Sequence, residues 1–267
     1  LGEEGGLVSQ PQRKRISYSE LKLWNDCSYK HKLVYLDKIN AFVGNEYTAF
    51  GSACHAVNEK LILDENIDTK SEFKKCFVKE IKALPDHSKL NKKLVLEMHE
   101  QAQDLFDHVI PEMKNYFGKY EVFKIEDPLF EEISEFETDF KFKGFIDLVI
   151  KTEDGKYHIL DWKTTSWGWR AEKKNDSITA YQLSLYKNYF ANKYNVDHSQ
   201  IETHFALLKR TAKGKKVEIF RVTNGKKRVA NAIDLLSKAI NHINSENFVK
   251  NRLSCKYCEF HKTKHCT

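Results

Sequence analysis

The chain has 267 residues, of which 41% are hydrophobic, 12% are aromatic and 31% are charged, and its formal net charge is +6. This length suits one large domain or two small ones, and the aromatic content argues against a disordered chain. No apolar run approaches the ~18 residues that a membrane-spanning helix needs, and residues 1–15 lack the apolar centre of a signal peptide. We therefore expect a cytoplasmic or otherwise intracellular protein without a membrane partner, and we interpret residues 1–15 as a flexible tail or an expression remnant.

The positive charge is concentrated near the C-terminus. Residues 205–267 contain 15 Lys and Arg but only 4 Asp and Glu, so the first 204 residues are net negative. An acidic body with a basic C-terminal region suits a protein that holds a metal in one place and a polyanion in another. A solvated, lysine-rich surface is the alternative explanation.

Hydrophobic patterning predicts helices first and a sheet later. Apolar residues at helical spacing predict helices at 16–36, with Ser17 or Ser19 as the N-cap, at about 49–63, and across 71–117 with breaks near Pro85 and Pro111. Alternating or β-rich runs then predict strands at 129–138, 140–151 and 156–164, with a hairpin turn at 153–155. In order, the remainder predicts a helix at 178–192, strands near 203–210 and 216–222, and a helix at 227–245.

This order of elements predicts a single mixed α/β domain over residues 16–267. The helices at about 60–120 would be an insertion into that domain, and residues 250–267 would form a Cys-rich clasp.

Three charged residues interrupt the predicted strands at 140–151 and 156–164. Asp147 lies in the run GFIDLVI, and Asp161 and Lys163 lie in ILDWKTT. A buried Asp is costly unless it is paired or coordinates a cation, and residues two apart in a strand face the same side. Asp147, on the neighbouring strand of the hairpin, could face Asp161. The two carboxylates suit a Mg²⁺ site with the lysine cation beside it. A cross-strand salt bridge between Lys163 and one Asp is the alternative.

Together with the surrounding motifs, these residues resemble the PD-(D/E)XK nuclease superfamily, in its RecB-type exonuclease branch. The matching pieces are G-x-x-x-H, G-x-x-D, acidic-x-Lys and Q-x-x-x-Y, here Gly51 and His55, Gly144 and Asp147, Asp161-Trp162-Lys163, and Gln182 and Tyr186. The resemblance implies a restriction-endonuclease-like core, with a mixed central sheet flanked by helices. It also implies a metal-dependent DNA nuclease, in the first place an exonuclease without sequence specificity.

The resemblance also implies roles for individual residues. The catalytic set would be Asp147, Asp161, Lys163, Gln182 and Tyr186. Mg²⁺ or Mn²⁺ would be held by His55, Asp147, Asp161 and the backbone carbonyl of Trp162. Glu59, one helical turn after His55, is a minor candidate, and either Glu131 or Glu132 could face the site from the preceding strand. Outside this family frame, His55 would be an ordinary histidine and Tyr186 a core aromatic residue.

The cysteines fall into two groups. Cys255, Cys258 and Cys266 crowd the last thirteen residues, and without a secretory signal the C-x2-C pair favours metal binding over a disulfide. The same nuclease branch includes enzymes that hold an iron–sulfur cluster between one upstream Cys and three C-terminal ones. This resemblance implies a [4Fe–4S] cluster on Cys27, Cys255, Cys258 and Cys266. Zinc, with His261 and His265 as further ligands, is the alternative. Cys54 and Cys76 are interpreted as small buried apolar residues.

A loop and a basic hairpin are the predicted DNA contacts. Hydroxyl groups, indole rings and cations follow the acidic-x-Lys strand, namely Thr164, Thr165, Trp167, Trp169 and Arg170. Such residues suit a single-strand channel, although one or both Trp could instead pack under a helix. The basic run that begins with Lys209 and Arg210 and continues through Lys213, Lys215 and Lys216 would form a sequence-independent phosphate track. The expected partner is DNA, single-stranded or at its ends.

Two other functions remain open at this point. The protein could be a non-catalytic DNA-binding scaffold, or a zinc-stapled nucleic-acid-binding adaptor whose acidic residues only form salt bridges. The chain has no Walker-type G-x-x-x-x-G-K-[ST] motif, so any unwinding motor would be a separate helicase or recombination partner. Recombination, repair and phage or CRISPR DNA processing are all compatible with the sequence.

Overall fold

The central feature of the fold is a mixed β-sheet. The computed structural model describes residues 15–39 and 42–267, and over these ranges it contains a six-stranded sheet with the order β1-β3-β4-β5-β6, in which β2 also pairs with β3. The pairs β1–β3 and β4–β5 are parallel and the others are antiparallel. The strands are β1 (Arg15–Ser17), β2 (Tyr120–Glu132), β3 (Lys141–Thr152), β4 (Tyr157–Thr165), β5 (Ile201–Lys209) and β6 (Val217–Arg221).

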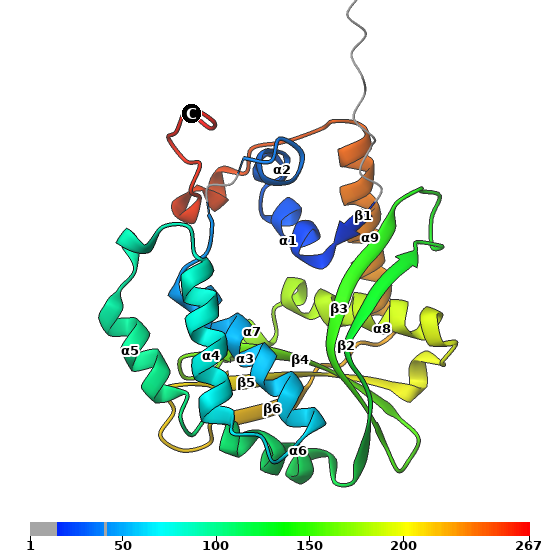
Figure 1. Cartoon of the computed structure of the whole chain (residues 1–267). Coiled ribbons are helices and arrows are strands. Elements are labelled where there is room, and N and C mark those ends of the chain that lie inside the picture. The colour runs from blue at the N-terminus through cyan, green and yellow to red at the C-terminus, as the bar shows by residue number, and fades with distance from the viewer. Residues whose placement is uncertain (1–14, 40–41) are drawn as a thin grey trace, which may run out of the picture.

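Helices cover both faces of the sheet (Figure 1). They are α1 (Tyr18–Asp26), α2 (Ser28–His31), α3 (Glu46–Leu63), α4 (Thr69–Ala83), α5 (Lys92–Gln101), α6 (Val109–Phe117), α7 (Ala171–Lys174), α8 (Ser177–Tyr194) and α9 (Lys226–Asn244). The other helical segments, of the 3-10 or π type, are η1 (Lys32–Leu36), η2 (His87–Lys89), η3 (Phe106–His108), η4 (His198–Gln200) and η5 (Arg252–Tyr257). No helix in the described ranges is both long and apolar enough to cross a membrane.

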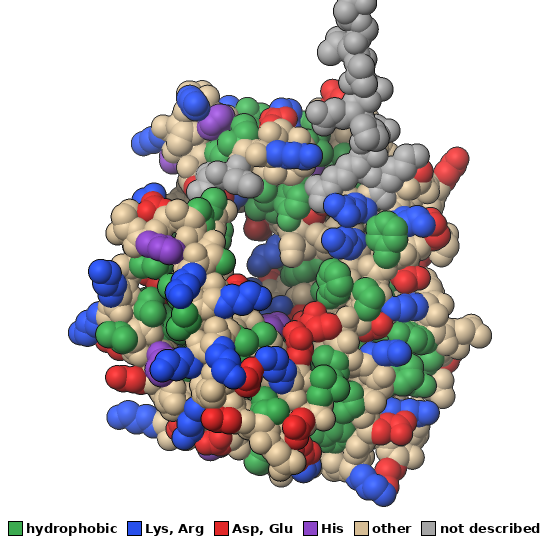
Figure 2. Space-filling model, in the orientation of Figure 1, with side chains coloured by type: hydrophobic (Ala, Val, Ile, Leu, Met, Phe, Trp, Pro, Cys, Tyr) green, Lys and Arg blue, Asp and Glu red, His purple; other side chains and the backbone are tan. Residues whose placement is uncertain are grey.

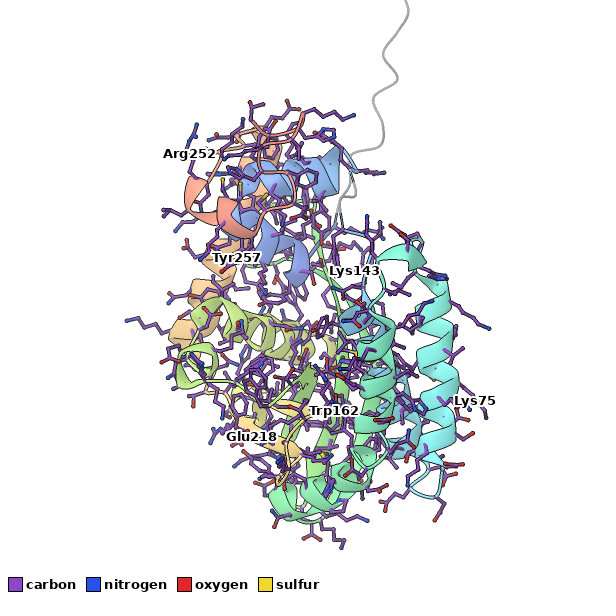
Figure 3. The ribbon with its side chains drawn as sticks, turned by 90° about the vertical axis from the view of Figure 1, so that its left-hand side faces the viewer. Lys75, Lys143, Trp162, Glu218, Arg252 and Tyr257 are labelled. Atoms are coloured by element: carbon purple, nitrogen blue, oxygen red, sulfur yellow. The ribbon has the colours of Figure 1, made fainter. Side chains whose placement is uncertain are left out.

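Each face of the sheet has its own hydrophobic core. On one face, α3, α4 and α6 pack over Leu160 and Trp162 of β4. On the other face, α1, α8 and α9 pack over Ile159 of the same strand and Phe205 of β5. Figure 3 places Trp162 in the interior, while Lys75 lies on the outer side of α4. Because side chains alternate along β4, Asp161 and Lys163 belong to the face that α8 covers.

The N-terminal prediction needs correction. Of the predicted tail, residues 1–14 lie outside the described ranges, and Arg15 already belongs to β1, which pairs parallel with β3. The predicted helix at 16–36 is three separate pieces, α1, α2 and η1. Ser17 is the N-cap as predicted, but the backbone is extended at Cys27, and α1 ends one residue before it. The apolar spacing continues across this break because helices on both sides pack onto the same core.

For the middle of the chain, the predicted helices and strands are present, but some of them begin or end at other residues than predicted. The predicted break at Pro85 is confirmed, whereas Pro111 lies in the first turn of α6, where a missing N–H costs little. β2 begins at Tyr120 rather than at residue 129, and it ends at Glu132. Its first half has few buried side chains, so it carries no alternating pattern. The hairpin turn and the remaining elements lie within a few residues of their predicted bounds.

Candidate active site

Asp147 occupies the point at which the β3–β4 ladder stops. The last residue pair of the ladder is Leu148 opposite Leu160. Asp147 is the residue before Leu148 in β3, and its Oδ2 accepts a hydrogen bond from the backbone N–H of Trp162 at 2.7 Å. The carboxylate thus replaces a strand partner and is fixed in the opening between the two strands.

Asp161 is buried and has polar partners from two elements. Oδ1 accepts a hydrogen bond from Nε2 of Gln182 on α8 at 2.7 Å, and Oδ2 lies 2.5 Å from Nζ of Lys163. Burial raises the pKa of Asp161 to about 6, against the opposing effect of the Lys163 charge. The negative charge of Asp147 adds to this rise in the pKa of Asp161, so the two carboxylates interact electrostatically across the opening between the strands.

Helix α3 brings His55 to the same opening. Asn45 caps the helix by accepting hydrogen bonds from the N–H groups of Tyr47 and Thr48. Nδ1 of His55 lies 3.5 Å from Oδ2 of Asp147. Burial lowers the pKa of His55, but its contact with Asp147 outweighs this and leaves the pKa raised. The predicted residues His55, Asp147, Asp161 and Lys163 therefore come together, from three separate elements.

The glycines of two motifs leave room for this packing. A Cβ on Gly144 would lie 2.9 Å from Cε1 of Tyr186, closer than carbon atoms can approach. The tyrosine ring of α8 therefore lies directly against β3, and its hydroxyl accepts a hydrogen bond from Gln182 at 3.2 Å. A Cβ on Gly51 would lie 3.4 Å from Oγ1 of Thr164, so α3 runs close to β4 at that point. Tyr186 thus packs in the core and also supports the side chain that holds Asp161.

One acidic residue at the site was missed by the sequence analysis. Ligand atoms of His55, Glu126 and Asp147 all lie within 4.8 Å of one another. Glu126 hydrogen-bonds Glu59, and burial, with the charges of Asp147 and Glu59, raises its pKa to about 7. Its backbone is left-handed, with φ of +47°, which is uncommon for a non-glycine residue and strained.

The two acidic residues that were considered for this position lie elsewhere. Glu131 and Glu132 are at the far end of β2, opposite Phe142 and Lys141, and Glu132 forms an ion pair with Lys141. The feature that could have identified Glu126 from the sequence is its position opposite Asp147 in a neighbouring strand. This position could be inferred only if the start of β2 had been predicted correctly.

The comparisons with known proteins agree with this geometry. A family model of the PD-(D/E)XK nuclease superfamily matches residues 15–263. The chain belongs to this superfamily. A search of curated proteins finds no match.

Two solved structures are similar to this nuclease. One, named "putative exonuclease" and from Eubacterium rectale, has a TM-score of 0.61 and 13% sequence identity, covering 98% of this chain and 93% of that chain. Another, named SSO0001, has a TM-score of 0.40 and 14% identity, covering 95% of this chain and 87% of that chain. The first likeness supports the fold, and with the family match it confirms the predicted nuclease core with its mixed sheet flanked by helices.

The site of this nuclease suits the divalent metal that its superfamily uses. Carboxylate oxygens are the donors that Mg²⁺ and Mn²⁺ prefer, and one imidazole is compatible with Mn²⁺. His55, Glu126 and Asp147 form a three-residue group of this chemistry, with the Asp161 carboxylate beside it. The donor set therefore fits a divalent cation.

The loop after β4 separates its two tryptophans. Trp167 is 75% exposed. Trp169 instead packs at the core, with its ring 5.0 Å from that of Phe205 and 6.1 Å from that of Phe220. Thr165 uses its hydroxyl within the loop, on the backbone of Gly168. Thr164 is half-buried against α3, and Arg170 is exposed. Of the two indoles, only Trp167 is free to stack on a base.

The basic run at residues 209–216 is largely paired within the nuclease. Lys209 lies 3.3 Å from Glu218, which also binds Lys174. Lys215 and Lys216 pair with Glu112 and Asp104. The guanidinium of Arg210 is buried, bonded to Gln101 and to Ser166 and placed over the ring of Tyr47. This pairing reduces the charge that the predicted phosphate track could offer.

The C-terminal tail lies against α2 of the nuclease. Val249 exchanges hydrogen bonds with Ser28, and Ser254 donates to the carbonyl of Asp26. Figure 3 shows Arg252 and Tyr257 beside the N-terminal helices. The four cysteines predicted to hold a cluster line one cavity of about 270 Å³, namely Cys27, Cys255, Cys258 and Cys266. Cys54 is buried in the core as predicted, whereas Cys76 is partly exposed.

Proposed function

We propose that this nuclease is a metal-dependent DNA exonuclease without sequence specificity. The observation that carries the proposal is the convergence of Asp147, Asp161, Lys163 and His55 at the opening between β3 and β4. A scaffold has no need to hold a buried and a half-buried carboxylate beside a lysine, because taking each charge out of water costs free energy that packing alone would not compensate. The similarity to a protein named as an exonuclease supports the same choice.

Mg²⁺ or Mn²⁺ would be held by His55, Asp147, Asp161 and the Trp162 carbonyl. A bound cation of this kind polarises the scissile phosphate and lowers the pKa of a coordinated water. Asp147 is already fixed by the Trp162 N–H, and Asp161 by Gln182, so neither side chain must reorganise to bind. Glu126 adds a carboxylate within 4.8 Å of the ligand atoms of His55 and Asp147.

Lys163 is placed to act on the attacking water and on the phosphate. Its Nζ lies against Asp161 and over the ring of Phe205, at 5.9 Å from the ring centroid, and the side chain is about one-third exposed. The neutral amine of Lys163 could take a proton from this water, whereas its ammonium form would orient the water and stabilise the charge that develops on the phosphate. Gln182 and Tyr186 position Asp161 rather than react.

The surface offers a path for a flexible DNA strand. Figure 2 shows a deep hollow between the helical side of the molecule and the side formed by β2 and β3, with Lys, Arg, Asp and Glu side chains on its walls. We infer that a single strand or a frayed DNA end enters here, because α3 on one side and β3 on the other carry His55 and Asp147 of the site. Trp167, Arg170 and the threonines after β4 are the residues proposed to contact it, by stacking and by phosphate binding.

We also propose that the clasp cysteines hold a [4Fe–4S] cluster. Cys27 and the three C-terminal cysteines line one cavity, although they are far apart in the sequence. Four thiolates around one cavity suit a cluster that binds each of them through a different iron.

A cleavage assay on end-labelled linear DNA and on covalently closed circles tests the proposed activity. Linear single-stranded DNA should be degraded with Mg²⁺ or Mn²⁺, and not with chelator or with Asp161→Asn. Circles should resist. Cleavage of circles would make the protein an endonuclease, and binding without cleavage in every metal would favour the scaffold.

A further inference from the structure

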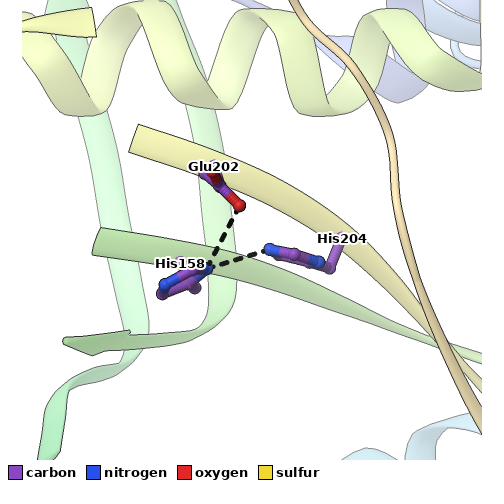
Figure 4. A group of neighbouring side chains, drawn as sticks. All are labelled: His158, Glu202 and His204. Carbon is purple, nitrogen blue, oxygen red and sulfur yellow. Dashed lines mark hydrogen bonds and ion pairs between the residues drawn. The ribbon is translucent and has the colours of Figure 1, made fainter. Parts of the chain in front are cut away.

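A second group of potential metal ligands lies on β4 and β5, away from the active site. In the parallel pairing of these strands, His158 lies beside Glu202, and His204 lies two residues further along β5. Nδ1 of His158 is 3.1 Å from Nε2 of His204 and 3.9 Å from Oε2 of Glu202 (Figure 4). These ligand atoms all lie within 4.8 Å of one another. Residues 158 and 161 differ by an odd number, so His158 faces the opposite side of the sheet from Asp161.

The donor set is that of a transition-metal site. Two imidazoles and a carboxylate suit Zn²⁺, whereas Mg²⁺ prefers oxygen ligands alone. The two rings face each other with Nδ1 of His158 and Nε2 of His204 at hydrogen-bond distance, so at least one of these two nitrogens carries no proton and has a lone pair to offer.

Other contacts hold two of the three ligands in place. Nε2 of His158 lies 3.0 Å from the hydroxyl of Thr152. Oε1 of Glu202 is held by Arg221 at 3.2 Å and by Lys156 at 3.5 Å, which leaves Oε2 turned toward His158. Metal sites commonly fix their ligands through such outer contacts. His204 is instead enclosed by the rings of α6, with Phe117 at 5.1 Å.

The group opens onto a cavity of about 580 Å³ that provides access for an ion. Its lining includes all three side chains together with Thr152, Asp154 and Lys156. The space admits a water as the fourth ligand that a three-residue zinc site requires.

We propose that His158, Glu202 and His204 form a Zn²⁺ site that ties β4 to β5 on the face covered by α6. The site is separate from the catalytic metal, and its role is to stabilise the fold. A metal-free hydrogen bond between the two histidines is the competing explanation.

Zinc binding to the full chain tests this proposal without any nuclease assay. After loosely held metal is removed by chelation, Zn²⁺ affinity is measured by titration, and Co²⁺ is used as an optical probe. Glu202→Gln and His158→Gln should weaken Zn²⁺ binding by at least about 10–100-fold and abolish the rise in Tm that Zn²⁺ causes. Tetrahedral Co²⁺ at this site should give visible bands without the thiolate charge-transfer absorption that binding to the clasp would add.

Two control variants separate this site from its neighbours. Glu153→Gln changes an acid that lines the same cavity but pairs with Lys119, and Asp147→Asn changes the active site, so each should leave this Zn²⁺ affinity unchanged. Unaltered Zn²⁺ binding in Glu202→Gln would overturn the proposal in favour of the histidine hydrogen bond. The proposal would also be overturned if Asp147→Asn lost Zn²⁺ binding and the variants of His158 and Glu202 kept it. Glu202 is partly exposed, so its variant remains informative even if His158→Gln fails to fold.

Discussion

Glu126 lies directly opposite Asp147 across β2 and β3, between the paired residues Ile125–Leu148 and Asp127–Ile146. Its left-handed backbone and its hydrogen bond to Glu59 bring a third carboxylate toward His55. A strained residue at such a place is a reasonable candidate for a functional role.

Glu126→Gln should raise the concentration of Mn²⁺ or Mg²⁺ needed for half-maximal cleavage by about 10-fold or more, because a neutral amide is a weaker ligand than a carboxylate. The measurement is the initial rate of cleavage over a metal titration. Glu131→Gln, on the same strand but away from the site, is the matched control. Identical metal dependence in both variants would exclude Glu126 from the metal site.

Asp161→Asn and Lys163→Ala should each lower the cleavage rate by at least ~100-fold, the scale of losing a metal ligand or a general acid–base group. DNA binding should change little in both variants, and the Tm should change little in Asp161→Asn, since the amide keeps the shape of the acid. Lys151→Ala on β3 serves as the control for loss of a lysine. If Tm falls sharply while the rate under Mn²⁺ stays normal, the Asp161–Lys163 pair is only a structural salt bridge.

The two tryptophans of the loop after β4 should differ in what they affect. Trp167→Ala should weaken single-stranded DNA binding by ~1–3 kcal/mol, the usual contribution of a stacked base, with no loss of stability. Trp169→Ala should instead lower the Tm, because its ring packs on Phe205 and Phe220. Fluorescence anisotropy and thermal melting distinguish these results. The reverse pattern would place Trp169 in the DNA path.

Cys258→Ser should remove the brown colour and most of the iron from protein purified without oxygen, and it should lower stability more than catalysis. A shared centre closes a loop of more than 200 residues and so removes much freedom from the unfolded chain. Cys76→Ser, at a cysteine outside the clasp, is the control. About four irons per chain are expected in the wild type, and a colourless protein with one zinc contradicts the cluster.

Stability should fall in acid partly through Glu218. Burial raises the pKa of this residue, but Lys174 and Lys209 outweigh burial and leave it lowered. A lowered pKa in the folded state means that the unfolded chain binds more protons, so the stabilisation is complete above the ordinary glutamate pKa and is lost as pH falls through the folded value. Chemical denaturation at a series of pH values below about 4.5 should show a smaller loss for Glu218→Gln than for the wild type. If the free energy of unfolding falls equally with pH in both proteins, the ion pairs of Glu218 with Lys174 and Lys209 do not stabilise the fold.

The sequence predicts the part of the site that lies in regular, buried strands. Asp147 and Asp161 stand out because a charge interrupts an apolar run, and their facing follows from strand alternation. Glu126 could not be found in this way, since the exposed first half of β2 has no alternation and a left-handed backbone leaves no mark in the sequence. The basic run was overestimated for a different reason. Glu218 is near in sequence, but Gln101 and Asp104 reach Arg210 and Lys216 only through the folded helical insertion.

The position of the clasp has a consequence for the order in which the chain is made. Ser28 leaves the ribosome 221 residues before its partner Val249. The strands β2 to β6 and helix α8 all lie between these two residues, so the sheet can form while Cys27 still awaits the three C-terminal cysteines. The clasp can therefore close only after these strands and α8 have been synthesised, and a core that folds first would be joined by it afterwards.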